Sequence, residues 1–157
     1  MSASTPPRAR HALVFGASGA IGAALLARLL DAGWTVDALS RTSRADGPQL
    51  RWHTGAFDAM PDTLPAQVDA IFSCGPLDQF SLWYASATID CPRIVAFGST
   101  SDATKQAASD PGERELAMRL RTSGERVFAA AQARGAAATL LRPTLVYGSG
   151  RDRNLSL

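Results

Sequence analysis

The chain has 157 residues, enough for one domain with a buried core, and 46% of them are hydrophobic. Its 16 Lys and Arg and 14 Asp and Glu give a net charge of +2, too small and too dispersed to predict a nucleic-acid partner. No apolar run approaches the roughly 20 residues that a membrane-spanning helix needs, so no membrane partner is expected.

The first ten residues are polar and lack the apolar segment of a secretory signal, and we interpret 1–10 as a flexible leader. The spacing of the two cysteines, Cys74 and Cys91, fits neither a zinc ribbon nor a redox pair. Both border apolar segments and are expected to be buried free thiols, which predicts a cytoplasmic protein. No motif in the sequence suggests a metal site.

Short apolar runs alternate with helical patterns along the chain, which predicts an α/β domain with a parallel sheet. Right-handed crossovers then give a three-layer, doubly wound parallel sheet over 11–157. Ligands in such sheets bind beyond the carboxyl ends of the strands. Strands are expected at 11–15, 34–40, 49–53, 68–74, 93–97 and 138–146, and helices at 20–32, 78–89 and 111–133.

The first and last of these helices have predicted apolar inner faces. The sequence D-P-G-E at 110–113 combines a good N-cap, a proline at the first helical position and a capping-box glutamate, and so predicts where the last helix begins. The inner faces are Ile21, Leu25 and Leu29 on the first helix, and Leu116, Leu120, Val127 and Ala131 on the last.

Residues 16–22, G-A-S-G-A-I-G, join the first strand to the first helix with glycines spaced three apart. A dinucleotide site needs glycines there, because a Cβ atom would hinder the sharp turn, the approach of a pyrophosphate and the packing of helix on sheet. The strand before the loop and the helix after it supply the context that this motif requires, and they favour dinucleotide binding over a purely structural turn.

The end of the second strand indicates which dinucleotide would bind. An NAD site usually has an acidic residue there for the ribose 2′-hydroxyl, but Asp37 lies three residues too early. Ser40, Arg41 and Arg44 are suited to a 2′-phosphate through charge-assisted hydrogen bonds. We therefore predict NADP, with NAD as the alternative if both arginines are merely solvated.

With this loop, G-S-T-S at 98–101 and L-R-P-T-L-V-Y-G at 141–148, the chain resembles the NAD(P)-dependent epimerase/dehydratase family, which are extended short-chain dehydrogenases. The resemblance runs from residue 11 to the last residue. It implies an NAD(P)-binding Rossmann domain, a nicotinamide cofactor, and a small-molecule substrate such as a nucleotide sugar. It also leaves a homodimer open.

The resemblance implies roles for individual residues. The phosphate loop would consist of Gly16, Ser18, Gly19, Ala20, Ile21 and Gly22. The cofactor ribose would pass Cys74, Gly75 and Pro76, and the nicotinamide would lie alongside Arg142, Pro143 and Thr144. The catalytic hydroxyls that bind the substrate oxygen would be Ser99 and Thr100, with Tyr147 and Gly148 at the substrate edge.

The chain departs from the family pattern near the adenine and at the acid/base pair. Where the family has Gly-Asp, this chain has Gly55-Ala56, with Asp58 two residues further on as the remaining acidic candidate. Ala117 and Arg121 occupy the positions of the family's Tyr-x-x-x-Lys pair. Arg121 would still hold the ribose, but a guanidinium is no proton donor at neutral pH.

The family's C-terminal substrate domain is expected to be absent, because the sequence stops shortly after the sixth predicted strand. Three functions remain open from the sequence. The first is an NADP-dependent oxidoreductase or epimerase that acts on a nucleotide sugar or a similar hydroxylated substrate. The second is a catalytically degenerate dinucleotide-binding sensor, scaffold or assembly protein. The third is an α/β scaffold that binds no nucleotide.

Overall fold

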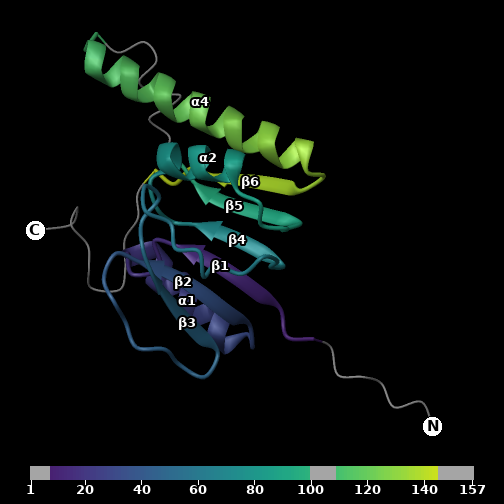
Figure 1. Cartoon of the computed structure of the whole chain (residues 1–157). Helices are drawn as coiled ribbons and strands as arrows, with labels where there is room; N and C mark the ends of the chain where they lie inside the picture. The colour runs from purple at the N-terminus through teal and green to yellow at the C-terminus, as the bar shows by residue number, and fades with distance from the viewer. Residues whose placement is uncertain (1–7, 100–108, 145–157) are drawn as a thin grey trace, which may run out of the picture.

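The computed structural model describes residues 8–99 and 109–144, which form one six-stranded sheet with helices on both faces (Figure 1). The strand order is β3-β2-β1-β4-β5-β6 and every neighbouring pair is parallel, which confirms the predicted doubly wound sheet. The strands are β1 His11–Phe15, β2 Thr35–Ser40, β3 Leu50–Thr54, β4 Ala70–Ser73, β5 Arg93–Phe97 and β6 Ala137–Leu141; the helices are α1 Ala20–Asp31, α2 Leu77–Ser86 and α4 Pro111–Ala133.

Two hydrophobic clusters fill the spaces between the helices and the sheet. Ala12 and Val14 of β1 pack on the α1 side with Leu26 and Leu29. Alternate residues of a strand point to opposite faces, so Leu13 and Phe15 of β1 belong to the second cluster. That cluster combines Leu13, Phe15, Ile71 and Ile94 of the sheet with Phe80 and Tyr84 of α2 and Val127 and Ala131 of α4.

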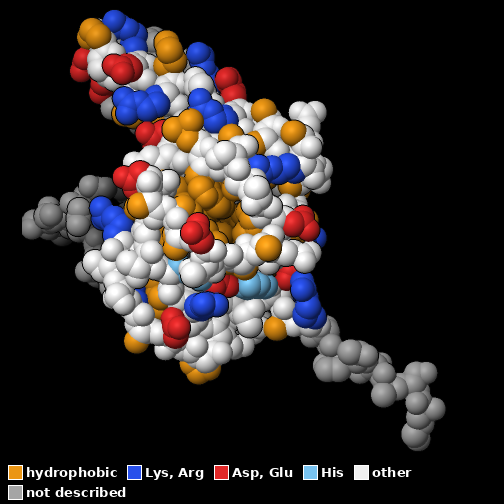
Figure 2. All heavy atoms as spheres, viewed as in Figure 1, with side chains coloured by type: hydrophobic (Ala, Val, Ile, Leu, Met, Phe, Trp, Pro, Cys, Tyr) orange, Lys and Arg blue, Asp and Glu red, His pale blue; other side chains and the backbone are white. Residues whose placement is uncertain are grey.

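Helix α4 begins where the sequence predicts. Asp110 is its N-cap, and the carboxylate accepts a hydrogen bond of 2.9 Å from the backbone N–H of Gly112. In Figure 1 the first turns of α4 extend past α2 and the sheet, and Figure 2 shows charged side chains of both signs there. Leu116 is 37% exposed, so its assignment to the inner face was wrong. Val127 and Ala131, which lie over the sheet, are buried as predicted.

Two other predictions need correction. The buried residues of α1 are Gly22, Leu26 and Leu29, so the inner face is rotated by about one residue from the predicted one. Gly22 causes this rotation, because it packs directly on the backbone of the loop that precedes the helix. The last strand ends at Leu141 and not at 146, since Pro143 lacks an N–H and restricts the residue before it.

On the face shown in Figure 2, hydrophobic side chains line a hollow. A groove between the 61–66 segment and the C-terminal end of α2 is lined by residues including Pro61, Leu64, Trp83 and Ile89. It lies away from the glycine loop and carries no charged side chain except Asp62.

Candidate functional site

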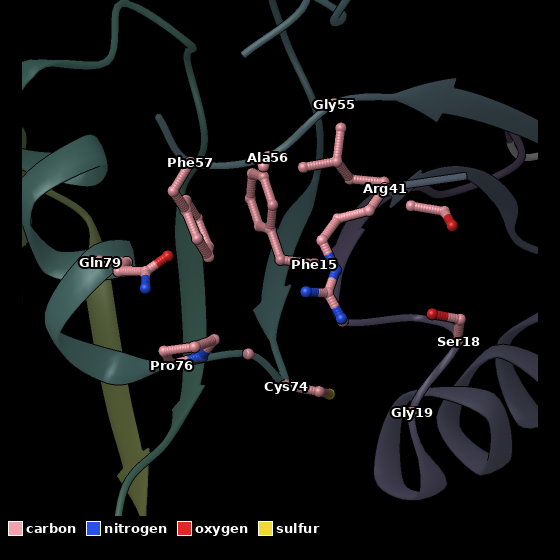
Figure 3. A pocket seen from close by; sticks show the side chains of 14 residues that line it. Phe15, Ser18, Gly19, Arg41, Gly55, Ala56, Phe57, Cys74, Pro76 and Gln79 are labelled. Carbon is pink, nitrogen blue, oxygen red and sulfur yellow. The ribbon is translucent and has the colours of Figure 1, made fainter. Parts of the chain in front are cut away.

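A cleft of about 350 Å³ lies at the carboxyl ends of β1, β2, β3 and β4. This is the edge of a doubly wound sheet where ligands bind. Figure 3 shows side chains from the glycine loop, from the loops after β2, β3 and β4, and from α2 directed into it. Its lining consists of Phe15, Gly16, Ser18, Gly19, Leu39, Ser40, Arg41, Gly55, Ala56, Phe57, Cys74, Gly75, Pro76 and Gln79.

The first and last glycines of the loop are required by its geometry. Gly16 has a φ of +69°, and a Cβ on it would lie 2.8 Å from the carbonyl carbon of Cys74. A Cβ on Gly22 would lie 2.0 Å from the carbonyl oxygen of Gly16. Both distances are shorter than any real Cβ contact, so a side chain at either position would displace the backbone. These glycines bring β1, α1 and the loop after β4 together around the cleft.

The N-terminus of α1 faces the cleft at Gly19. The backbone N–H of Gly19 donates to the carbonyl oxygen of Gly16 at 3.0 Å, and no side chain of the described residues caps the helix. Ala20, Ile21 and Gly22 form the first turn, where backbone N–H groups lack helical acceptors and the helix dipole is positive. The first turn of α1 also carries no acidic residue. Such a helix end is suited to bind a phosphate group.

Ser40 and Arg41 line the cleft at the end of β2, and Arg44 lies beside it. The Arg41 guanidinium points into the cleft in Figure 3. The Arg44 guanidinium stacks over the ring of Trp52 at 5.1 Å, and its Nε donates to the Ser40 hydroxyl at 3.2 Å. Two arginines and a hydroxyl therefore surround the end of β2.

Asp37 is directed away from the cleft. Its carboxylate accepts hydrogen bonds from Nε2 of His11 and from Nε2 of His53, which come from the strands on either side of β2. Thr63 bonds the other ring nitrogen of His53 at 2.8 Å. Asp37 and His53 are both buried. The carboxylate is thus engaged within the sheet, as expected for a side chain that lies too early on the strand to face the cleft.

The loop after β3 forms a further wall of the cleft with Gly55, Ala56 and Phe57. The N–H of Gly55 donates to the carbonyl oxygen of Ser40 at 2.9 Å, and Ala56 and Ala59 exchange two backbone hydrogen bonds of 3.2 and 3.0 Å. The next residue, Asp58, is exposed and does not line the cleft.

The two cysteines are free, and burial makes both poor nucleophiles. Desolvation raises the pKa of the Cys74 thiol to about 11, so this thiol is protonated at neutral pH although it lines the cleft. Burial also raises the pKa of Cys91, whose thiol donates to the carbonyl oxygen of Arg93 at 3.1 Å. Cys91 is buried as predicted, whereas Cys74 is only half-buried.

The described residues expected to serve catalysis or to hold the nicotinamide end of the cofactor do not line this cleft. Ser99 follows β5, is half-buried and is not part of the lining, and Thr100 lies outside the described residues. On α4, Arg121 is exposed, whereas the Ala117 side chain is 1% exposed. Pro143 is half-buried and also lies outside the lining.

The sequence analysis missed several residues of the site. Phe15, Leu39, Phe57 and Gln79 line the cleft. Phe15 and Leu39 belong to apolar strand runs, and their role as cleft wall is not visible in such a run. Phe57 could have been predicted, because it directly follows the Gly55-Ala56 pair that the sequence places near the adenine. Gln79 is the third residue of α2 and has no accompanying motif.

Two other kinds of feature are absent from the part of the chain that the structure describes. Among residues 8–99 and 109–144, no group of three or more His, Cys, Asp or Glu side chains is placed to hold a metal ion. None of the helices in this part of the chain is both long and apolar enough to cross a membrane.

Comparison with known proteins gives one family match. Residues 12–87 match the model of the NAD dependent epimerase/dehydratase family. This segment runs from β1 to the end of α2, so it includes all of the residues that line the cleft. No curated protein matches the sequence significantly.

Solved structures show the same fold at low sequence identity. Gre2 from Candida albicans has a TM-score of 0.70 at 12% identity, with 88% of this chain and 58% of Gre2 covered. The Bordetella bronchiseptica enzyme WbmH in complex with NAD+ has a TM-score of 0.61 at 14% identity, with 87% and 56% covered. MoeE5 in complex with UDP-glucose and NAD has a TM-score of 0.60 at 18% identity, with 83% and 52% covered. This chain thus spans about half the length of each.

Proposed function

Because the match over residues 12–87 makes the chain a member of the NAD dependent epimerase/dehydratase family, we propose that its cleft binds NADP. The observation that carries this proposal is the position of Arg41 in the cleft, on the same edge of the sheet as the N-terminus of α1. A dinucleotide with its pyrophosphate at the helix N-terminus has its adenosine ribose near the end of β2. The residues of the cleft therefore suit a dinucleotide both at the pyrophosphate and at the adenosine ribose.

NADP is favoured over NAD by the charges at the end of β2. The 2′-phosphate of NADP would meet the Arg41 guanidinium and the Ser40 hydroxyl, with Arg44 held against Ser40 as a second positive charge. The 2′-hydroxyl of NAD would find no carboxylate at this strand end, because Asp37 is bound to two histidines. The complexes of WbmH and MoeE5 contain NAD, so NAD stays the alternative.

We further propose that the chain serves an oxidoreductase or epimerase acting on a nucleotide sugar or a similar hydroxylated substrate. The cofactor would supply hydride transfer, and Ser99 and Thr100 would bind the oxygen at the reacting carbon. The UDP-glucose in the MoeE5 complex supports this substrate class by analogy of fold alone. The free, unreactive cysteines are in keeping with a cytoplasmic protein.

One observation favours the second function, a dinucleotide-binding protein without hydride chemistry. Ala117, at the position that the family resemblance gives to the acid/base tyrosine, is buried and carries no titratable group. Arg121, at the position of the lysine, is exposed on α4. A protein of this kind would bind NADP with the same preference and would not oxidise or reduce any nucleotide sugar.

Replacing the arginine in the cleft tests the NADP proposal. Arg41→Ala is expected to weaken NADPH binding about tenfold and to leave NADH binding within about twofold, because a hydrogen bond to a charged group contributes roughly 1.5–3 kcal/mol. Isothermal titration with both dinucleotides measures the two dissociation constants. Arg51→Ala, which removes the same charge from an exposed position on β3, is the matched control and should change neither. An equal loss of affinity for both dinucleotides in Arg41→Ala would contradict a role in 2′-phosphate recognition.

A further inference from the structure

We propose that this cleft holds the base of its dinucleotide by the faces of the purine ring and does not read the base edge. A dinucleotide with hypoxanthine in place of adenine would then bind about as tightly. This inference rests on the proposed binding of NADP and concerns the part of the cleft beyond the ribose, for which the sequence offered only Asp58 as a candidate.

The expected position of the base follows from the proposed positions of the pyrophosphate and the 2′-phosphate. With the pyrophosphate at the N-terminus of α1 and the 2′-phosphate at Arg41, the adenosine base extends beyond the end of β2. The cleft continues there between two walls. One is the loop after β3, with Ala56 and Phe57, and the other is the loop after β4, with Cys74, Gly75 and Pro76.

These walls offer apolar and cationic groups suited to a purine face. The centroid of the Phe57 ring lies 5.1 Å from that of Phe15, and a Cβ on Gly75 would lie 3.4 Å from the Phe57 ring, so this ring reaches from its own wall to the opposite one. In Figure 3 Phe57 and Arg41 both reach into the cleft, on either side of Phe15. Aromatic rings and guanidinium groups bind bases by stacking, and such contacts are tolerant of the base because every base has a π-face.

The same walls offer little that distinguishes one purine edge from another. Adenine presents an exocyclic amine, which only donates, whereas hypoxanthine presents a carbonyl oxygen, which only accepts. A fixed acceptor opposite this exocyclic group, such as a carboxylate, would select adenine. The residue after Gly55 that lines the cleft is Ala56, which has no polar side-chain atom, and the nearby carboxylate of Asp58 is exposed and outside the lining.

Among the described residues of these walls, neither the N–H groups of Gly55 and Ala56 nor the Gln79 amide restores the selection. The N–H groups of Gly55 and Ala56 are already bonded to Ser40 and Ala59. Gln79 is the amide side chain of the lining and is exposed. An amide has an oxygen acceptor at one end and an N–H₂ donor at the other, and rotation of its terminal torsion exchanges them. Gln79 therefore meets an amine or a carbonyl equally well.

The test compares NADPH with reduced nicotinamide hypoxanthine dinucleotide phosphate by isothermal titration of the full chain. We expect dissociation constants within about threefold of one another, a difference of about 0.7 kcal/mol or less. Ala56→Asp places a carboxylate at the base edge, where it accepts from the adenine amine and repels the hypoxanthine oxygen. In this variant adenine should be preferred by about tenfold or more. Ala59→Asp adds the same charge in the same turn, outside the lining, and should keep the ratio of the unaltered chain.

The outcomes separate this inference from the proposed function. A preference of the unaltered chain for NADPH over the hypoxanthine analogue by more than about threefold overturns the inference and leaves NADP binding intact. An Ala56→Asp protein that binds both dinucleotides with an unchanged ratio overturns the placement of the base. If Ala56→Asp does not fold, the ratio measured on the unaltered chain decides. Failure of the unaltered chain to bind either dinucleotide refutes the proposed function, and this inference with it.

Discussion

Gly22→Ala is expected to abolish dinucleotide binding and to lower the free energy of unfolding by about 3 kcal/mol. The added methyl group would lie 2.0 Å from the carbonyl oxygen of Gly16 and 2.8 Å from the Cα of Ala17. Both are backbone atoms, so relief requires that α1 moves away from the loop. That movement displaces the helix N-terminus at which the pyrophosphate would bind. Chemical denaturation measures the stability, and isothermal titration with NADPH measures the binding.

Gly112→Ala is the matched control, because Gly112 also lies in the first turn of a helix. Among the described residues, the nearest atom to a Cβ there would be a carboxylate oxygen of Asp110, at 3.5 Å. The alanine should raise stability by about 0.4–1 kcal/mol through helix propensity and should leave binding unchanged. Equal stability and equal NADPH affinity for Gly22→Ala and the unaltered chain would show that α1 does not pack on the loop as described.

Asp37→Ala is expected to lower the free energy of unfolding by about 3 kcal/mol, because it removes the shared acceptor of two imidazoles. His53 is 4% exposed and would keep an N–H with no acceptor in the interior. Chemical denaturation measures the loss, and Asp31→Ala at the exposed end of α1 is the control. If Asp37→Ala and the unaltered chain had nearly the same free energy of unfolding, the bridging arrangement would be contradicted.

The same variant also tests the direction of the Asp37 side chain. Since the carboxylate points away from the cleft, Asp37→Ala should bind NADPH and NADH in the same ratio as the unaltered chain. A selective loss of NADH affinity would instead assign Asp37 to the ribose 2′-hydroxyl.

The order of elements was predictable because each is specified locally. The glycine loop, the Asp110–Pro111 start of α4 and the β-branched and apolar strand runs act within a few residues of chain. The buried faces of the helices were less predictable. A helical pattern alone cannot show that Gly22 is packed on the loop, which rotates α1, or that the first turns of α4 extend past the sheet and leave Leu116 exposed.

The cleft was predictable to the extent that its residues lie in motifs. The glycine loop and the residues after β2 and β4 line it together, as the order of parallel strands implies. The stacking of Arg44, which follows β2, on Trp52 of β3 depends on the pairing of β2 with β3. The bridge of His11, Asp37 and His53 joins three strands and depends on the register of β2 with β1 and β3. That register leaves no local trace in the sequence.

The most direct test of the central claim is an isothermal titration of the unaltered chain with NADPH and, separately, with NADH. Binding at one site per chain, with NADPH at least about tenfold tighter than NADH, is the result expected from Arg41 and Ser40 at the end of β2 and the phosphate-binding N-terminus of α1. No saturable binding of either dinucleotide would contradict the claim that this cleft is a dinucleotide site.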